Sequence, residues 1–399
     1  MTTERAYWVA WAEAKGVGSV LLKRLHSHFG SLAAAWQADD GALLEVEGIG
    51  ILLASQLADY RQRVDPDKLL GQWEENGANF WTPADPDYPA LLFEITDPPP
   101  LLYYKGRTEL AQAVQTMPSV GIVGTRDPSD YGQRWTRRIV QQLARHDVIV
   151  VSGLASGIDR CAHSQALDSK GLTIAVLGTG VDRSYPWSNQ ALQARIAEEG
   201  LLLSEHPNDT PPDRTHFPRR NRIIAGLSRA TVVTEAPLRS GALITARLAN
   251  DYGREVYALP GSLDNPASLG CLDLIRQGAQ MIWDDTTLIR DLGQIPQLDA
   301  PPTQATANKE SSTSGKTSGK TSRKTAPPQG SPSPRPAPAD LSPDLAAVLA
   351  AITPAPITLD HLVQRLNRPT GEILSNLLHL ELEGLVTQTP PGSHRYQRC

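Results

Sequence analysis

The residues best suited to chemistry in this chain gather in one short segment. Residues 215–227 read THFPRRNRIIAGL, with Arg219, Arg220 and Arg222 at one end and an apolar run behind them. A guanidinium is planar and can donate two parallel hydrogen bonds to a phosphate. Three guanidiniums at the start of a helix whose far end must pack into a core therefore predict a fixed anion site.

Apolar runs that end in small or polar residues follow one another between positions 119 and 262. They read SVGIVG, VIVVSG, LTIAVLG, LLLSE, ATVVTEA and EVYALPG, and most are separated by amphipathic stretches of helical length. Such alternation is typical of a parallel sheet covered by helices on both faces. The pattern predicts a Rossmann-like, doubly wound α/β fold with a mostly parallel sheet, which a last unit closes near residue 293.

The ends of these runs define a candidate binding rim, because ligands of open parallel sheets bind beyond the C-terminal ends of the strands. The first run leads into Gly124, Thr125 and Arg126, and the fifth leads to Ser240 and Gly241 at a helix start. Small residues let a ligand approach the backbone, and helix N-termini offer N–H donors to anions.

We therefore expect Arg126 and the arginines of residues 219–222 to converge on one phosphate chain. The alternative for these arginines is ion pairing with Glu205, Glu235 or Asp213.

Composition limits the function classes. The 399 residues carry a formal net charge of −5, so any basic site must be local. The three cysteines lie far apart, which argues against a zinc site or a disulfide framework. The N-terminus lacks the apolar segment of a signal peptide, and no apolar run approaches the ~20 residues of a membrane span. We expect a cytoplasmic protein with no metal site.

Four regions are expected along the chain. Residues 1–65 should form a helical domain and residues 66–296 the extended Rossmann-like domain. Residues 297–340 are rich in Pro, Ser, Thr and Lys and should be a disordered linker. Residues 341–399 should form a winged helix, for which protein contact is at least as plausible as DNA contact because its exposed helix face is poor in Lys and Arg.

The N-terminal region contains two similar turns, Gly16-Val17-Gly18 and Gly48-Ile49-Gly50, each followed by an amphipathic helix. They resemble a tandem helix-hairpin-helix, or SAM-like, motif, which can place backbone N–H groups against a DNA phosphate. A small helical bundle with glycine turns accounts for them equally, and we favour it because few Lys or Arg flank either turn.

Catalysis has little support in the sequence. The first turn of the sheet reads GTRDPSDYG, which departs from the GxGxxG of dinucleotide folds, and no GxxxxGK[ST] occurs. No catalytic residue and no cofactor are therefore predicted. Glu235 could act as a general acid or base on a nucleotide, but pairing with an arginine is the simpler interpretation.

Several motifs together resemble the DNA-processing protein A family (DprA/Smf). They are VGIVGTR at 120–126, VSGLASGIDRCAH at 151–163, AVLGTGVDRSYP at 175–186, SEHP at 204–207, FPRRNRIIAGLS at 217–228, VVTEAPLRSGALITA at 232–246 and VYALPGS at 256–262. Their order and spacing match the family over roughly residues 70–290. The helical N-terminal region and the C-terminal winged helix agree with the family as well.

The resemblance implies a cytosolic bacterial DNA-binding protein rather than an enzyme. It would bind single-stranded DNA without sequence preference. It would load RecA recombinase onto incoming strands in natural transformation. A second copy of the chain would complete a homodimer. Nothing identifies the dimer face or the RecA-contacting residues.

Carried over to this sequence, the resemblance implies that Arg126, Arg220, Asn221 and Arg222 line the DNA pocket and that Phe217 contacts a base. Arg219 falls on a variable position of the motif. Trp187 stands where the family often has a basic residue, which loses a phosphate contact or replaces it with stacking. Two alternatives stay open: a nucleotide-processing enzyme on the same rim, and a scaffold that recruits partners through the linker and winged helix.

Overall fold

The structure is a computed structural model that describes residues 2–75, 77, 79–293, 343–352, 357–366, 368, 372–373, 376–377, 379–380, 385–388 and 395–398. Two compact units divide the chain, Met1–Thr306 and Ala307–Cys399. The whole linker predicted at 297–340 lies outside the described residues, as do some residues at the ends of its neighbours. Among those described, no helix is both long enough and apolar enough to cross a bilayer.

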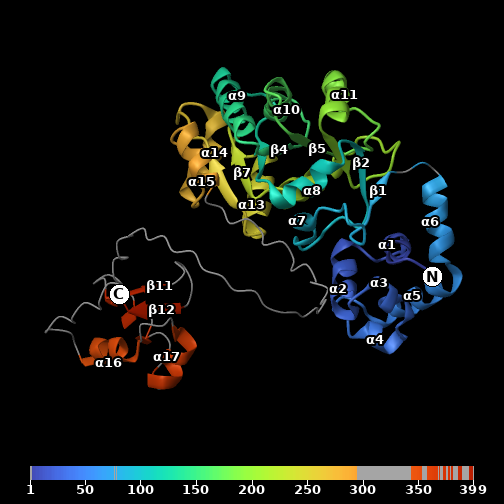
Figure 1. Cartoon of the computed structure of the whole chain (residues 1–399), viewed down its shortest axis with the longest axis horizontal. Helices are drawn as coiled ribbons and strands as arrows, with labels where there is room; N and C mark the ends of the chain where they lie inside the picture. The colour runs from blue at the N-terminus through green and yellow to red at the C-terminus, as the bar shows by residue number, and fades with distance from the viewer. Residues whose placement is uncertain are drawn as a thin grey trace, which may run out of the picture. The chain divides into compact units, whose positions relative to one another are not determined.

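The first part of the larger unit is helical, as the sequence predicts (Figure 1). Its core gathers Trp8, Trp11, Leu25 and Leu57 among other apolar side chains. Both glycine turns precede a helix: Gly18 is the N-cap of α2 and Gly50 is the N-cap of α5. The helices are α1 (Glu4–Glu13), α2 (Ser19–Phe29), α3 (Leu32–Gln37), α4 (Asp40–Leu44), α5 (Ile51–Arg63) and α6 (Pro66–Glu75).

A nine-stranded sheet forms the centre of the same unit, in the order β1-β2-β6-β5-β4-β3-β7-β8-β9. The six predicted strands are β3 to β8. The strands are β1 (Phe80–Trp81), β2 (Leu102–Gly106), β3 (Ser119–Val123), β4 (Ile149–Ser152), β5 (Thr173–Leu177), β6 (Leu201–Ser204), β7 (Ala230–Val233), β8 (Glu255–Ala258) and β9 (Gln280–Met281).

The strands from β3 to β9 run parallel, which confirms the Rossmann-like prediction. The strand β3 is the switch point, because it pairs with β4 on one side and with β7 on the other. Residues 66–118 add two strands to the sheet that the sequence analysis did not predict. Their strands β1 and β2 extend it in the antiparallel sense, with Tyr103 opposite Ser204 of β6.

Helices cover both faces of the sheet, since β3 to β7 are buried along their whole length (Figure 1). One core layer joins Val123 and Val176 to Ile223 of α12 and Leu243 of α13. Another joins Val150 to α9, α10 and α15. The helices are α7 (Ala90–Phe93), α8 (Glu109–Thr116), α9 (Asp130–Arg145), α10 (Ile158–Asp168), α11 (Gln190–Glu199), α12 (His216–Gly226), α13 (Ala242–Asp251), α14 (Leu269–Arg276) and α15 (Asp285–Leu292), with 3-10 turns at Trp187–Asn189 and Pro266–Ser268.

The smaller unit has the expected winged-helix elements. A three-stranded sheet has the order β10-β12-β11, and Leu362, Ile373 and Leu377 lie in the core beneath it. The elements are α16 (Pro343–Ala351), β10 (Ile357–Thr358), α17 (Leu359–Leu366), β11 (Val386–Gln388) and β12 (Arg395–Arg398).

Candidate nucleic-acid interface

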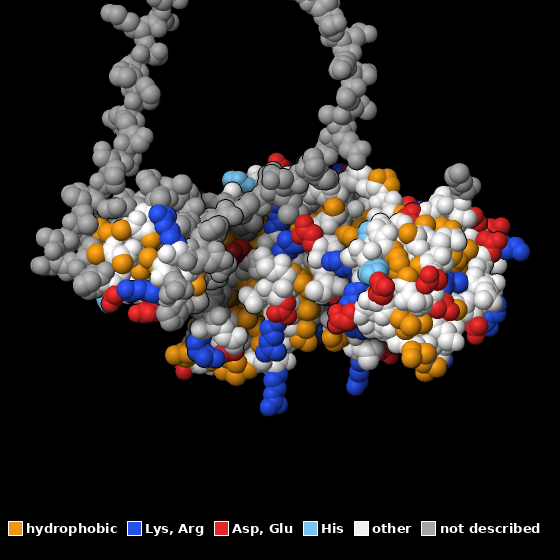
Figure 2. Space-filling model, turned by 90° about the horizontal axis from the view of Figure 1, so that it is seen from below, with side chains coloured by type: hydrophobic (Ala, Val, Ile, Leu, Met, Phe, Trp, Pro, Cys, Tyr) orange, Lys and Arg blue, Asp and Glu red, His pale blue; other side chains and the backbone are white. Residues whose placement is uncertain are grey.

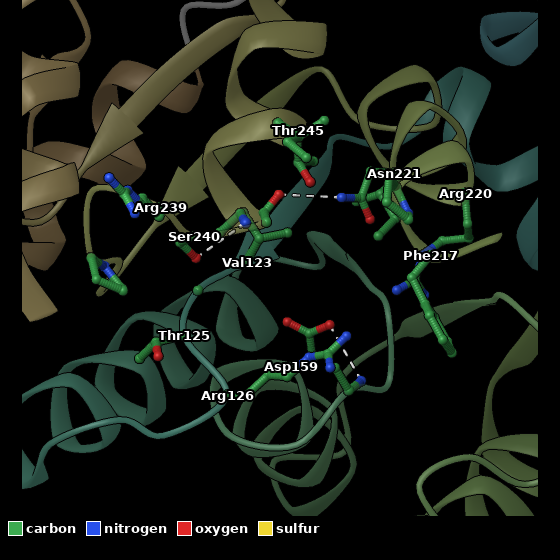
Figure 3. Close-up of a pocket in the computed structure, with 18 of the residues that line it drawn as sticks. Val123, Thr125, Arg126, Asp159, Phe217, Arg220, Asn221, Arg239, Ser240 and Thr245 are labelled. Carbon is green, nitrogen blue, oxygen red and sulfur yellow. Dashed lines mark hydrogen bonds between the residues drawn. The ribbon is translucent and has the colours of Figure 1, made fainter. Parts of the chain in front are cut away.

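A cavity of about 610 Å³ opens at the C-terminal end of β3, where the strand order reverses. Its walls come from the loop after β3, the first turn of α12 and the start of α13 (Figure 3). The cavity therefore lies where open α/β sheets bind ligands. It brings together eight of the ten predicted site residues: Gly124, Thr125, Arg126, Phe217, Arg220, Asn221, Ser240 and Gly241.

The loop that carries Arg126 is held by backbone hydrogen bonds on both sides. The Thr125 N–H donates to the Glu235 carbonyl at 2.7 Å, and the Thr125 carbonyl accepts from the Ile158 N–H at 3.1 Å. Gly157 permits this approach, because its φ is +77° and a Cβ there would overlap the backbone of residues 125–126. The Arg126 side chain is exposed and forms no ion pair with any described residue.

Two stacked aromatic rings form a wall beside Arg126. The rings of Phe217 and Tyr185 lie 5.2 Å apart with an angle of 28° between their planes. The Arg126 guanidinium lies 5.7 Å from the centre of the Phe217 ring, within the range of a cation–π contact. An unpaired cation next to an exposed aromatic face suits the phosphate and the base of one nucleotide.

Arg220 lies at the bottom of the cavity and is almost completely buried, with 4% of its surface exposed. Its Nη1 donates to the Gly153 carbonyl at 2.6 Å and also to the Val176 carbonyl, so it joins α12 to the ends of β4 and β5. Burial lowers the pKa of Arg220 to about 10, while the nearby Asp159 carboxylate raises it and Arg126 lowers it further. The group therefore remains a cation at neutral pH.

Asp159 is the acidic residue of the cavity wall. It is buried on α10 and accepts a hydrogen bond from the Ala155 N–H at 3.3 Å. Burial raises the pKa of its carboxyl, and the Arg220 charge opposes that shift. The Asp159 carboxylate therefore compensates part of the Arg220 charge within the fold.

Asn221, Ser240 and Gly241 link the two helix starts. The Asn221 amide donates to the Gly241 carbonyl at 3.3 Å (Figure 3). The Ser240 hydroxyl accepts from the Ala242 N–H at 3.3 Å at the beginning of α13. These contacts fix the side of the cavity that faces Arg126.

Arg219 and Arg222 lie outside this cavity and line a neighbouring one. Arg222 is buried between Asp97, at 3.0 Å, and Glu205, at 2.8 Å, which is the ion-paired alternative that the sequence allowed. Arg219 is exposed and forms no ion pair with any residue that the structure describes. The three neighbouring arginines thus have three different environments.

Sequence reasoning gave no role to several lining residues. Tyr185 lies directly before Pro186 in the AVLGTGVDRSYP motif, whose aromatic residue was the available signal. Arg214 and Arg239 are exposed cations of the same cavity without ion pairs to described residues. Arg239 lies within the PLRSGA segment, but Arg214 stands in a loop without a comparable signal.

Residues suited to acid–base chemistry are occupied by structural contacts. Glu235 is buried and accepts hydrogen bonds from the Ser129 N–H, the Ser129 hydroxyl and the Asn265 amide, at 2.8, 2.6 and 3.1 Å. It therefore holds the start of α9 instead of pairing with an arginine. His163 is buried on α10, with Nδ1 2.8 Å from the Thr173 hydroxyl. Burial lowers the pKa of His163 to about 3, and the neighbouring Arg220 charge acts in the same direction.

Charge over the wider surface is mixed. Figure 2 shows acidic side chains interspersed with Lys and Arg over the part of the Met1–Thr306 unit seen in that view. The cavity differs from this background, because Arg126, Arg214, Arg220 and Arg239 line it with Asp159 as the one acidic lining residue among those described. The net charge of −5 requires any basic site to be local, and this cavity meets that condition.

Comparison with known proteins identifies the family. A model described as DNA recombination-mediator protein A matches residues 79–293, and one described as the DprA winged helix domain matches residues 332–392. The chain belongs to the DNA recombination-mediator protein A family. Membership in this family supports a DNA-processing, recombination-mediator role and is consistent with a protein that is not an enzyme.

Curated relatives extend the match beyond the sheet domain. Protein Smf of Synechocystis sp. is 46% identical over 396 residues, which cover 99% of each chain. Protein Smf of Escherichia coli is 36% identical over 364 residues, 90% of this chain and 88% of the relative. The X-ray structure of DNA processing protein A from Streptococcus pneumoniae matches with a TM-score of 0.61 and 34% identity, over 73% of this chain and 98% of that one.

Proposed function

We propose that the 610 Å³ cavity binds single-stranded DNA without sequence preference. We further propose that the protein is a homodimer in the bacterial cytoplasm. In natural transformation it loads RecA recombinase onto the bound strand. The observation that carries the binding proposal is that three exposed cations without ion pairs to described residues, Arg126, Arg214 and Arg239, line one cavity. The stacked rings of Phe217 and Tyr185 line the same cavity.

The chemistry of the lining supports tolerance of any sequence. Guanidiniums contact phosphates, which are the same at every nucleotide. Aromatic rings stack on every base, because every base has a π-face. At the start of α13, the small Ser240 and Gly241, where a Cβ would meet nothing within 4 Å, leave the backbone accessible to the strand.

Arg126→Ala tests the phosphate contact. Fluorescence anisotropy with labelled dT and dC oligomers should show affinity about tenfold lower for both sequences. The plot of log affinity against log salt concentration should have a slope that is shallower by ~0.7, the value for one phosphate contact on a single strand. Arg137→Ala is the matched control, because Arg137 is exposed on α9 and lines neither of the two cavities. Equal affinities for Arg126→Ala and the unmodified protein would refute the assignment.

Phe217→Ala tests base stacking. Loss of one stacked base costs ~1–3 kcal/mol, so affinity should fall for every oligomer while the salt slope stays unchanged. Phe217→Tyr keeps the ring and should retain most of the affinity. A weakening by Phe217→Ala that depends on base identity would contradict sequence-tolerant binding.

RecA loading and dimerisation rest on the family resemblance and need their own experiments. Loading predicts that the protein shortens the lag in RecA filament assembly on single strands already coated by a single-strand binding protein. The Arg126→Ala variant should lose this effect in proportion to its DNA affinity. Sedimentation of the full chain would measure the dimer.

A nucleotide-processing enzyme is the competing function, because the cavity occupies the nucleotide-binding edge of the fold. The three hydrogen bonds that occupy Glu235 leave this carboxylate poorly placed for proton transfer. Turnover of a nucleotide panel that disappears in Glu235→Gln, with unchanged stability, would favour the enzyme.

A further inference from the structure

A second cavity, of about 630 Å³, adjoins the first. The two share Pro218 of α12 and Ile244 of α13 as a common wall. The far side of the second cavity comes from the N-terminal helical region, where Ser19, Val20 and Arg24 line it. The second cavity is therefore a gap between the sheet domain and α2 that continues directly from the proposed DNA site.

The charges around this gap leave one guanidinium without a counterion. Three arginines line it, Arg24, Arg219 and Arg222. Arg24 is paired with Glu47 at 3.3 Å, and Arg222 is paired with Asp97, which lines the same gap, and with the buried Glu205. Arg219 is exposed and has no ion-pair partner among the described residues, so its guanidinium is free to contact an anion in the gap.

The start of α2 adds backbone donors to the same gap. Gly18 gives no side-chain cap, and the first helical hydrogen bond runs from the Leu22 N–H to the Gly18 carbonyl at 2.9 Å. The N–H groups of Ser19, Val20 and Leu21 consequently lack helical partners, and all three residues line the gap. This helix start alone would not identify a site, but it lines the same gap as Arg219, which has no ion pair with a described residue.

We propose that the second cavity holds the continuation of the single DNA strand. The strand leaves the first cavity over Pro218 and Ile244 and passes between α12 and α2, with its phosphates near Arg219 and the N–H groups at the start of α2. This assignment rests on the proposed function. It gives the first of the two glycine turns a role in phosphate binding, which the scarcity of flanking Lys and Arg had argued against.

Nucleic acid fits the gap better than a protein segment does. The gap is continuous with a cavity lined by arginines, and a free cation lies next to unpaired N–H donors, an arrangement that favours an anion. The exposed apolar side chains of Val20 and Ile244 offer contact surface to sugars and base faces.

Ser19→Glu tests the inference without disturbing the helix, because a carboxylate in the first turn is favourable there. Anisotropy should use two labelled oligomers, dT of about 4 and dT of about 16 nucleotides, which are the lower and upper site sizes of single-strand-binding OB folds. The variant should bind the long oligomer about fivefold more weakly at low salt, since one added charge opposes a phosphate, and the short one with unchanged affinity. Arg219→Ala should reproduce this length dependence.

Ser55→Glu is the matched control, since it makes the same change at an exposed position of α5 that does not line either cavity. If Ser19→Glu binds both oligomers normally, or Ser55→Glu weakens the long one equally, the continued path is refuted while the proposed function stands. Failure of the unmodified protein to bind either oligomer would instead remove the proposed function, and the continued path with it.

Discussion

Arg222 provides the most demanding test of which arginines at positions 219–222 stabilise the fold and which contact DNA. Its guanidinium is 6% exposed and lies between the Glu205 carboxylate, 10% exposed, and the Asp97 carboxylate, 31% exposed. Removing one partner of a buried ion pair leaves an uncompensated charge in the protein. Arg222→Ala should therefore affect folding more than it affects a contact with DNA.

The two carboxylates contribute unequally to the expected loss. Breaking a buried pair costs ~3–5 kcal/mol. Asp97 is partly reached by water and keeps a hydrogen bond from the Tyr252 hydroxyl at 3.0 Å, so most of the cost comes from Glu205. We expect a loss of about 3 kcal/mol in the free energy of unfolding, against the 5–15 kcal/mol typical of a domain, so the variant should still fold.

Urea unfolding of the full chain, followed by circular dichroism, measures this loss as a lower midpoint. Arg276→Ala is the control, because Arg276 forms an exposed pair with Asp273 at 2.7 Å that should contribute no more than ~1 kcal/mol. Adding Glu205→Gln to Arg222→Ala should restore part of the stability by removing the unpaired charge. An unchanged midpoint together with weakened DNA binding would show that Arg222 contacts DNA directly and would refute this reasoning.

Two further predictions concern the interior beneath the cavity. A Cβ at Gly153 would overlap the Arg220 guanidinium, so Gly153→Ala should lower the stability by ~1–3 kcal/mol in thermal unfolding. Gly71→Ala is the control and should not lower it, because a Cβ there meets nothing within 4 Å. Equal melting temperatures for the two variants would contradict the packing around Gly153. His163 has a pKa of about 3 in the folded chain against ~6.5 unfolded, so only the unfolded chain binds this proton between those values. Stability should consequently fall as the pH drops below 6.5, by up to ~1.4 kcal/mol per pH unit from this residue, and a His163→Gln variant should show a flatter profile.

The parallel part of the sheet was predictable because its strands are continuous apolar runs, a pattern that requires burial on both faces. The short antiparallel strands β1 and β2 were missed, since two aromatic residues at 80–81 and a strand after three prolines give no clear periodicity. Their position follows from tertiary pairing with β6, which local sequence does not encode.

The candidate site was predictable where it depends on strand ends and helix starts, which topology places on one edge. Arg126, Phe217 and Gly241 meet there for that reason. The distribution of the arginines could not be predicted, because residue types alone do not distinguish a guanidinium that faces the cavity from one that faces Glu205. Tyr185 was missed because its contribution comes from stacking on Phe217, 32 positions away in the chain.

Arg220 illustrates why a buried arginine can still serve binding. Two backbone carbonyls accept its hydrogen bonds, and the carboxyl nearby, that of Asp159, has its own pKa raised by burial. A guanidinium with a pKa of about 10 keeps its charge at pH 7 beneath the floor of the cavity. Because the guanidinium is buried, its charge is weakly screened, and in the proposed DNA site it would attract a phosphate bound by Arg126 without having to leave the carbonyls. The same side chain therefore ties α12 to the sheet and adds to the positive field of the cavity.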